Sequence, residues 1–170
     1  YQEALGSAMA MAQQDALTGV RNKHAYVQAE SEMDELISKE QAPPFAVVVC
    51  DVNGLKKVND TQGHSAGDAF IKSACKMICD AFKHSPVFRI GGDEFAILLK
   101  GHDYENRDAL MAALQTQQEE HLRKGLVTVA AGLSVFEPGS DLHTQDVFER
   151  ADDAMYQKKA DMKASQQQEE

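Results

Sequence analysis

Three acidic side chains stand where the chain is predicted to leave buried strands. Asp51 follows an apolar run, and Asp93 and Glu94 follow two glycines between two further apolar runs. A sheet that pairs these runs brings the three carboxylates together at one edge. One or two carboxylates, completed by substrate phosphates and water, are the ligands that Mg²⁺ prefers. A solvated acidic turn is the competing interpretation, although Gly91 and Gly92 also let a ligand approach the backbone closely.

The polar segment 51–60 is predicted to be a loop between a buried strand and a helix. Backbone N–H groups in such a loop can hold phosphates, and Lys56 or Lys57 would add a positive charge. Asn59 and Asp68 have side chains suited to hydrogen bonding with a base edge, but an Asp near a helix start is as often a cap. Polar loops also serve solubility, so this segment alone does not decide between the two interpretations.

Hydrophobic periodicity predicts the elements that position these residues. Amphipathic spacing indicates helices at about 22–37, 70–82, 107–121 and 147–158, and apolar runs or alternation indicate strands at 45–50, 87–90, 95–99 and 127–135. The two middle strands form a β-hairpin around the Gly-Gly turn. The order βαββαβ predicts an α/β (α+β) domain with a ferredoxin-like or palm-type central sheet and surrounding helices, its crossover helices on one face.

Length and composition favour one such domain. The chain has 170 residues, 43% of them hydrophobic, which is enough for one well-packed core. Helical spacing at 1–14 predicts a signalling helix that enters from an upstream domain. The polar segment 166–170 is predicted to be a disordered tail. No apolar run reaches the roughly 20 residues that cross a bilayer, and no signal peptide is evident, so we expect a soluble domain without membrane contact.

Charge and cysteine content narrow the class of partner. A formal net charge of −10 argues against binding a nucleic acid polymer, which requires clustered Lys and Arg. Three cysteines, Cys50, Cys75 and Cys79, cannot all pair, so buried thiols in a reducing cytoplasm are the expectation.

Four segments, in order, resemble the GGDEF domain of diguanylate cyclases. They are Asp15–Asn22, Asp51–His64 with Gly67 and Asp68, Phe88–Phe95, and Ala151–Tyr156. The resemblance covers roughly Asp15 to Lys163. It implies a catalytic domain at 15–165 with the GGDEF hairpin at its active site.

The resemblance implies specific roles. Asp51 and Asp93 match the metal-binding carboxylates, the Val52 carbonyl matches a backbone ligand, and Glu94 matches the second acidic position of the turn. It therefore implies two Mg²⁺ ions, with Mn²⁺ as the alternative, and catalytic roles for the three acidic residues. The implied substrate-binding residues are the guanine-recognising Asn59 and Asp68, the phosphate-binding Lys56 and Lys159, and Leu55, Gly91, Gly92 and Lys163.

Several positions depart from the family pattern. Asn53 stands where Asp is common, Leu55 where Phe is common, and Lys23 and Lys163 where Arg is common. None removes a metal ligand, but Lys163 offers a point charge in place of a bidentate fork. Lysines near the end of the last helix also favour the helix dipole, which is their default interpretation.

A further departure concerns product inhibition. The family's Arg-x-x-Asp motif falls at Phe82 and Ser85, which lack the guanidinium and the carboxylate, so we expect no inhibitory product site there.

The resemblance implies condensation of two GTP molecules into cyclic di-GMP and two pyrophosphates. Ring closure requires a homodimer with the active site between subunits. The resemblance also implies an upstream sensor that acts through the segment 1–14. The catalytic domain would lie in the cytoplasm, also where it forms part of a membrane-anchored sensor protein. One alternative is a catalytically silent GGDEF module that binds nucleotide and regulates a partner. The other is another nucleotidyl cyclase or a polymerase-like palm. Asn59 and Asp68 argue against this second alternative, because they match residues that recognise guanine.

Overall fold

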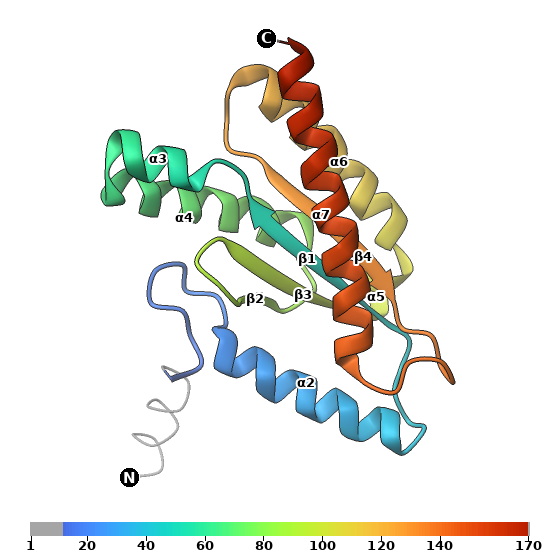
Figure 1. The fold of residues 1–170 in the computed structure, drawn as a ribbon. Coiled ribbons are helices and arrows are strands. Elements are labelled where there is room, and N and C mark those ends of the chain that lie inside the picture. The colour runs from blue at the N-terminus through green and yellow to red at the C-terminus, as the bar shows by residue number, and fades with distance from the viewer. Residues whose placement is uncertain (1–11, 170) are drawn as a thin grey trace.

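The computed structural model describes residues 12–169 and contains four strands and six helices in that range (Figure 1). The elements are α2 (Lys23–Ser38), β1 (Phe45–Val52), α3 (Leu55–Gln62), α4 (His64–Ala81), β2 (Val87–Arg89), β3 (Glu94–Lys100), α5 (Gly101–Glu105), α6 (Arg107–Lys124), β4 (Val129–Val135) and α7 (Thr144–Glu169). None of the helices in the described range has the length and apolar character needed to span a bilayer.

The strands form one antiparallel sheet in the order β2-β3-β1-β4. The helices α3 and α4 connect β1 to β2, and α5 and α6 connect β3 to β4. Each crossover skips one strand, which places β1 and β3 at the centre of the sheet. This arrangement confirms the mixed α/β fold and the βαββαβ order expected from the apolar runs.

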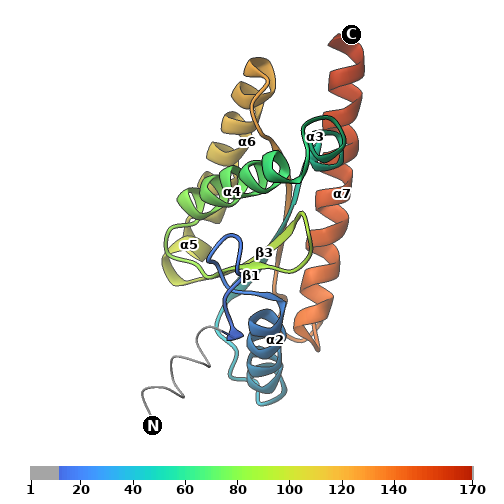
Figure 2. The ribbon, with the colours of Figure 1, turned by 90° about the vertical axis from the view of Figure 1, so that its left-hand side faces the viewer.

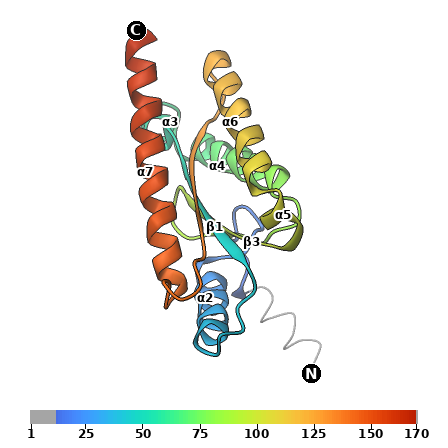
Figure 3. The same ribbon diagram turned by 90° about the vertical axis from the view of Figure 1, so that its right-hand side faces the viewer.

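Helices cover both faces of the sheet (Figures 2 and 3). Val48 and Cys50 of β1 face a core shared with α4 and α6, whereas Val47 and Val49 face a core shared with α2 and α7. The crossover helices α4 and α6 lie on one face, as expected, and the flanking helices α2 and α7 cover the other. Every residue of β1 is buried, and a strand without polar alternation requires apolar partners on both sides.

Two boundaries within the domain differ from those expected. β1 continues through Asp51 and Val52, because both of its neighbours extend the hydrogen-bonded ladder past Cys50. Most of the expected loop 51–60 is helical, since α3 begins at Leu55 after Gly54, whose φ of 78° suits glycine.

The chain ends also differ. The helix α7 runs to Glu169 and includes most of the segment 166–170, for which the sequence predicts a disordered tail. Gln and Glu are good helix formers, so their polarity does not end a helix. Most of the predicted N-terminal helix, residues 1–11, lies outside the described residues, and Gln14 forms a β-bridge with Arg21 instead of a helical turn.

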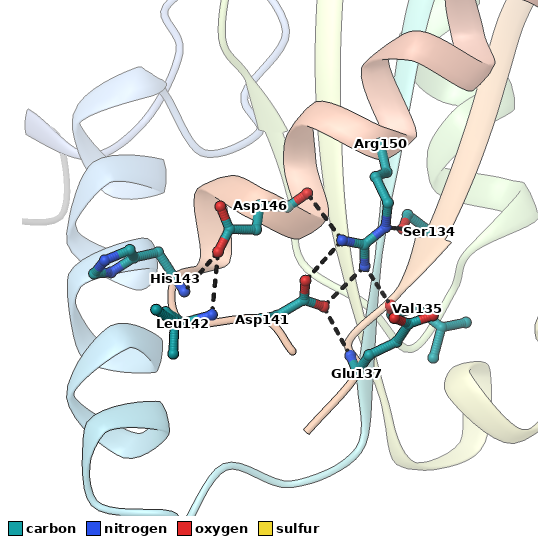
Figure 4. Close-up of polar contacts among 8 residues, drawn as sticks. All are labelled: Ser134, Val135, Glu137, Asp141, Leu142, His143, Asp146 and Arg150. Atoms are coloured by element: carbon teal, nitrogen blue, oxygen red, sulfur yellow. Dashed lines mark hydrogen bonds and ion pairs between the residues drawn. The ribbon is translucent and has the colours of Figure 1, made fainter. Parts of the chain in front are cut away.

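Arg150 fixes the start of α7 against the edge strand β4 (Figure 4). Its guanidinium donates to both carboxylate oxygens of Asp141, at 2.7 and 2.8 Å, and to the Val135 carbonyl at 2.9 Å. Asp141 also accepts the Glu137 N–H, and the Arg150 guanidinium holds the pKa of this buried carboxyl below its usual value. The bidentate pair sets the position of α7 along the sheet.

Gly132 of β4 allows the close approach of α7. A Cβ at this position would collide with the backbone of Ala151 and Met155, whereas a Cβ at Gly92 would meet no described atom within 4 Å. Backbone cannot rotate away as a flexible side chain can. The glycine is therefore a packing requirement.

We predict that Gly132→Ala lowers the free energy of unfolding by about 1–3 kcal/mol or more, because α7 must move away from the sheet. Urea unfolding followed by circular dichroism measures this effect. Gly92→Ala is the matched control and should stay within about 0.5 kcal/mol of the natural chain. Equal stability of the two variants would contradict the proposed close packing.

Candidate active site

The end of β1 and the β2–β3 hairpin bring the three predicted carboxylates together. Asp51 pairs in register with Glu94, and the Val52 N–H donates to the Asp93 carbonyl at 2.9 Å. Glu94 is the first residue of β3 and not part of the turn, because its backbone continues the ladder with β1. Residues more than 40 positions apart thus meet at one edge of the sheet, as the sequence predicts.

Asp51 is the buried member of this group, with 8% of its surface exposed. The Lys159 ammonium on α7 donates to its Oδ2 atom at 2.9 Å, while its buried Oδ1 atom has no hydrogen-bond partner among the described residues. Burial raises the pKa of Asp51 to about 6, and the carboxylate of Asp93 adds to this effect while Lys159 opposes it. The described residues therefore satisfy one carboxylate oxygen of Asp51 and leave the other without a hydrogen-bond partner.

Glu94, like Asp51, lies beside the helix α7. Burial raises the pKa of Glu94, the carboxylates of Asp152 and Asp93 raise it further, and Lys159 and Lys23 act in the opposite direction. Acidic groups thus outnumber the lysines beside them. Such a concentration of carboxylates is stabilised by a cation.

The residues present fit a divalent metal. In the range 12–169 no group of three or more His, Cys, Asp or Glu side chains forms a complete metal cluster. Mg²⁺ needs no such cluster, since it is commonly held by one or two carboxylates together with phosphates and water. The Oδ1 atom of Asp51, which no residue of the range 12–169 contacts by a hydrogen bond, offers a ligand atom.

The predicted base-reading residues lie on α3 and α4. Asn59 is partly buried, and its side chain packs so closely on Gly67 that a Cβ there would overlap its amide group. Asp68 is the next residue of α4 and is exposed. The two side chains therefore project from neighbouring points where α3 meets α4, and Gly67 makes the approach possible.

The predicted phosphate ligands have different surroundings. Lys159 is held by Asp51, whereas Lys56 in the first turn of α3 and Lys163 on α7 are exposed. Leu55 packs against the core at the start of α3. Only Lys159 is shown in direct contact with a carboxylate of the site.

Gly91 and Gly92 form the turn before the acidic pair, and Arg89 holds this turn in place. Its guanidinium donates to the Gly92 carbonyl at 2.7 Å and contacts the Asp15 carboxylate at 3.2 Å. Asp15 in turn accepts the Thr18 N–H and hydroxyl. The loop that precedes α2 is thus connected through one arginine to the residue before Asp93.

The sequence patterns do not reveal the roles of Arg89, Asp152 and Asn53. Arg89 stands directly before the hairpin turn, but its partner Asp15 is 74 residues away. Asp152 precedes Lys159 by seven positions on a helix, a spacing that places both on one face. Asn53 donates to the Thr128 hydroxyl at 3.1 Å and so connects β1 to the start of β4.

Fold and site together define a palm-type α/β domain with an acidic pair at the junction of its central strand and a glycine hairpin. A family model described as "Diguanylate cyclase, GGDEF domain" matches residues 12–165. The chain belongs to the GGDEF-domain family. This finding confirms the resemblance drawn from the four segments.

Named relatives include proteins of two kinds. The chain is 30% identical over 161 residues to diguanylate cyclase DgcS of Shewanella oneidensis, covering 94% of this chain and 52% of that protein. It is 31% identical over 150 residues to cyclic di-GMP phosphodiesterase PdeR of Escherichia coli, covering 86% of this chain and 22% of that protein. The chain thus spans about half or less of the length of these relatives.

A solved structure has the same fold. The coiled coil and GGDEF domain of DgcB from Caulobacter crescentus, in complex with c-di-GMP, superimposes with a TM-score of 0.72 at 25% identity. The match covers 94% of this chain and 86% of that chain. The arrangement of strands and helices described above is therefore that of a GGDEF domain.

We predict that Arg89→Lys loosens the turn, because a single ammonium cannot hold both the Asp15 carboxylate and the Gly92 carbonyl. Hydrogen exchange of the Val52 amide, which donates to Asp93, reports on this turn. Its protection should fall about tenfold, as expected for loss of a charged hydrogen bond. Unchanged Val52 protection, with the Val48 amide as internal control, would contradict the positioning role of Arg89.

Proposed function

We propose that this chain is the catalytic output domain of a diguanylate cyclase, which condenses two GTP molecules into cyclic di-GMP and two pyrophosphates. The proposal rests on the buried Asp51 carboxylate, one oxygen of which has no partner among the described residues, beside Asp93 in a complete Gly-Gly-Asp-Glu-Phe sequence. The similarity to DgcS supports it.

In this proposal the residues of the chain bind and orient one GTP. The Asn59 and Asp68 side chains would hydrogen-bond the guanine edge, and the exposed Lys56 and Lys163 would bind phosphates together with the N-terminus of α3. Lys159 already neutralises part of the charge of Asp51 and would also face the triphosphate. Gly91 and Gly92 leave room for the nucleotide beside the backbone.

The reaction is phosphoryl transfer, repeated once to close the ring. The 3′-oxygen of one GTP forms a bond to the α-phosphorus of the other, the bond to pyrophosphate breaks, and the hydroxyl proton leaves. Two Mg²⁺ ions, or Mn²⁺, held by Asp51, Asp93, Glu94 and the Val52 carbonyl would lower the pKa of the hydroxyl and stabilise charge on the phosphates. The protein contributes the fixed positions of these groups.

Assembly and location form part of the proposal. One domain binds one GTP, so catalysis requires a homodimer in which two bound nucleotides face each other. An upstream sensor would control this pairing through the segment before residue 15. GTP as substrate and three free cysteines fit a cytoplasmic domain.

We also propose that product does not inhibit the domain through the family's usual motif. Phe82 is 1% exposed and belongs to the core, and the Ser85 hydroxyl donates to the Asp103 carboxylate at 2.6 Å. Neither side chain offers a charged group to a cyclic dinucleotide.

A silent module that binds nucleotide and regulates a partner is the second candidate. The similarity to PdeR favours it, because that protein is named for a different activity. It predicts binding of GTP without turnover. The complete acidic turn of this chain favours the cyclase.

We predict that the purified chain converts GTP with Mg²⁺ into a product with the mass of cyclic di-GMP. Asp93→Asn should lower the rate about a hundredfold or more while the protein remains folded, because a charged metal ligand is lost with little change in volume. The exposed Asp60→Asn on α3 is the matched control and should retain the rate. Binding of GTP without any product, at concentrations where the chain is dimeric, would favour the silent module instead.

A further inference from the structure

Two histidines meet away from the acidic site, at a cavity between the end of α4 and the helices α5 and α6. The cavity has a volume of about 440 Å³. His84 lies in the segment that leads to β2, and His102 lies in α5. Their ring centroids are 4.9 Å apart with an angle of 74° between the ring planes. Nothing in the proposed cyclase reaction uses either residue.

A buried carboxylate holds both histidine-bearing segments. The side chain of Asp103 is 2% exposed, and its Oδ2 atom accepts the His84 N–H at 3.1 Å and the Ser85 hydroxyl at 2.6 Å. Its Oδ1 atom lies 3.5 Å from Nδ1 of His102. One carboxylate therefore sets the position of the His84 backbone and faces the His102 ring.

Two features of this arrangement, the ring separation and the carboxylate, match an imidazole metal site. Zinc-to-nitrogen bonds of about 2.0–2.1 Å place the ring centroids of two imidazoles about 5 Å apart on a tetrahedral ion. A carboxylate behind a ligating histidine is the usual second partner, because it orients the ring and raises its basicity. In the described part of the chain, His84 and His102 have both the ring separation and the carboxylate.

The ligand chemistry of the cavity determines which cation it suits. Asp80 and Asp103 line it together with Lys83, and Asp80 forms an ion pair with Lys76 at 3.0 Å. Imidazole ligands select Zn²⁺, Cu²⁺ or Ni²⁺ over Mg²⁺, which prefers oxygen ligands. An ion at this position would therefore differ in kind from the one expected at Asp51.

We propose that His84 and His102 form a binding site for a divalent metal ion of the zinc type, separate from the site at Asp51 and Asp93. No third His, Cys, Asp or Glu of residues 12–169 completes a closed cluster with them, so water fills the remaining positions and the ion exchanges with solvent. The ion connects the segment before β2 to α5. Asp103 is a positioning residue that acts through His102.

The test is a titration of the chelator-treated chain with Zn²⁺ by calorimetry, in a buffer with excess Mg²⁺ to occupy oxygen-rich sites. We expect one ion per chain, and ¹⁵N shifts of the His84 and His102 rings that change together as it binds. His84→Gln and His102→Gln should each weaken binding at least tenfold, and Asp103→Asn about tenfold or more. Unfolding followed by circular dichroism establishes that each variant is folded.

Two controls separate this site from other zinc ligands. His143→Gln removes another exposed imidazole, and Cys79→Ser removes a thiol of the soft kind that Zn²⁺ also binds. Both should leave the affinity unchanged. The proposal is overturned if the chain takes up no Zn²⁺, which would leave the ring contact as edge-to-face packing, or if uptake survives in the double histidine variant.

Discussion

The central strand β1 carries a carboxylate into the interior of the protein, and much of the site follows from the cost of that burial. Its apolar residues are fully enclosed, yet the strand continues to Asp51, which is 8% exposed. A buried charge is unfavourable unless it is paired and hydrogen-bonded. Lys159 satisfies one oxygen, and the other has no partner among the described residues. Within the described part of the chain, one oxygen of Asp51 is therefore open to a ligand.

Two long-range constraints keep Asp93 and Glu94 beside Asp51. The register between β1 and β3 pairs Asp51 with Glu94, and a slip of one residue would turn every side chain to the opposite face. Arg89 joins Asp15 to the Gly92 carbonyl and so connects the loop before α2 to the turn. The same helix that supplies Lys159 is positioned by Gly132 and by the Arg150–Asp141 pair. Packing far from the site therefore determines its geometry.

The sequence was sufficient where a single segment carries the signal. The apolar run before Asp51 and the glycine hairpin before Asp93 predicted the βαββαβ order and the meeting of the carboxylates, because both follow from local patterns in the sequence. The sequence did not predict features that depend on contacts between distant segments of the chain. The helix α3 has no buried residue to give it a helical period, so the sequence predicts a loop there. The pairs Arg89–Asp15 and His84–His102 join residues whose spacing forms no pattern, so only the folded chain reveals them.

In the proposed function Asp51 is a ligand of the metal ion that accompanies a bound nucleotide, and not merely a partner of Lys159. The most direct measurement is calorimetric binding of a non-hydrolysable GTP analogue, with Mg²⁺ and with a chelator, to the natural chain and to Asp51→Asn. We expect that removing Mg²⁺ weakens binding to the natural chain about tenfold or more, and that Asp51→Asn loses most of this dependence. Equal affinity of the natural chain with and without Mg²⁺, or an undiminished Mg²⁺ effect in folded Asp51→Asn, would contradict it.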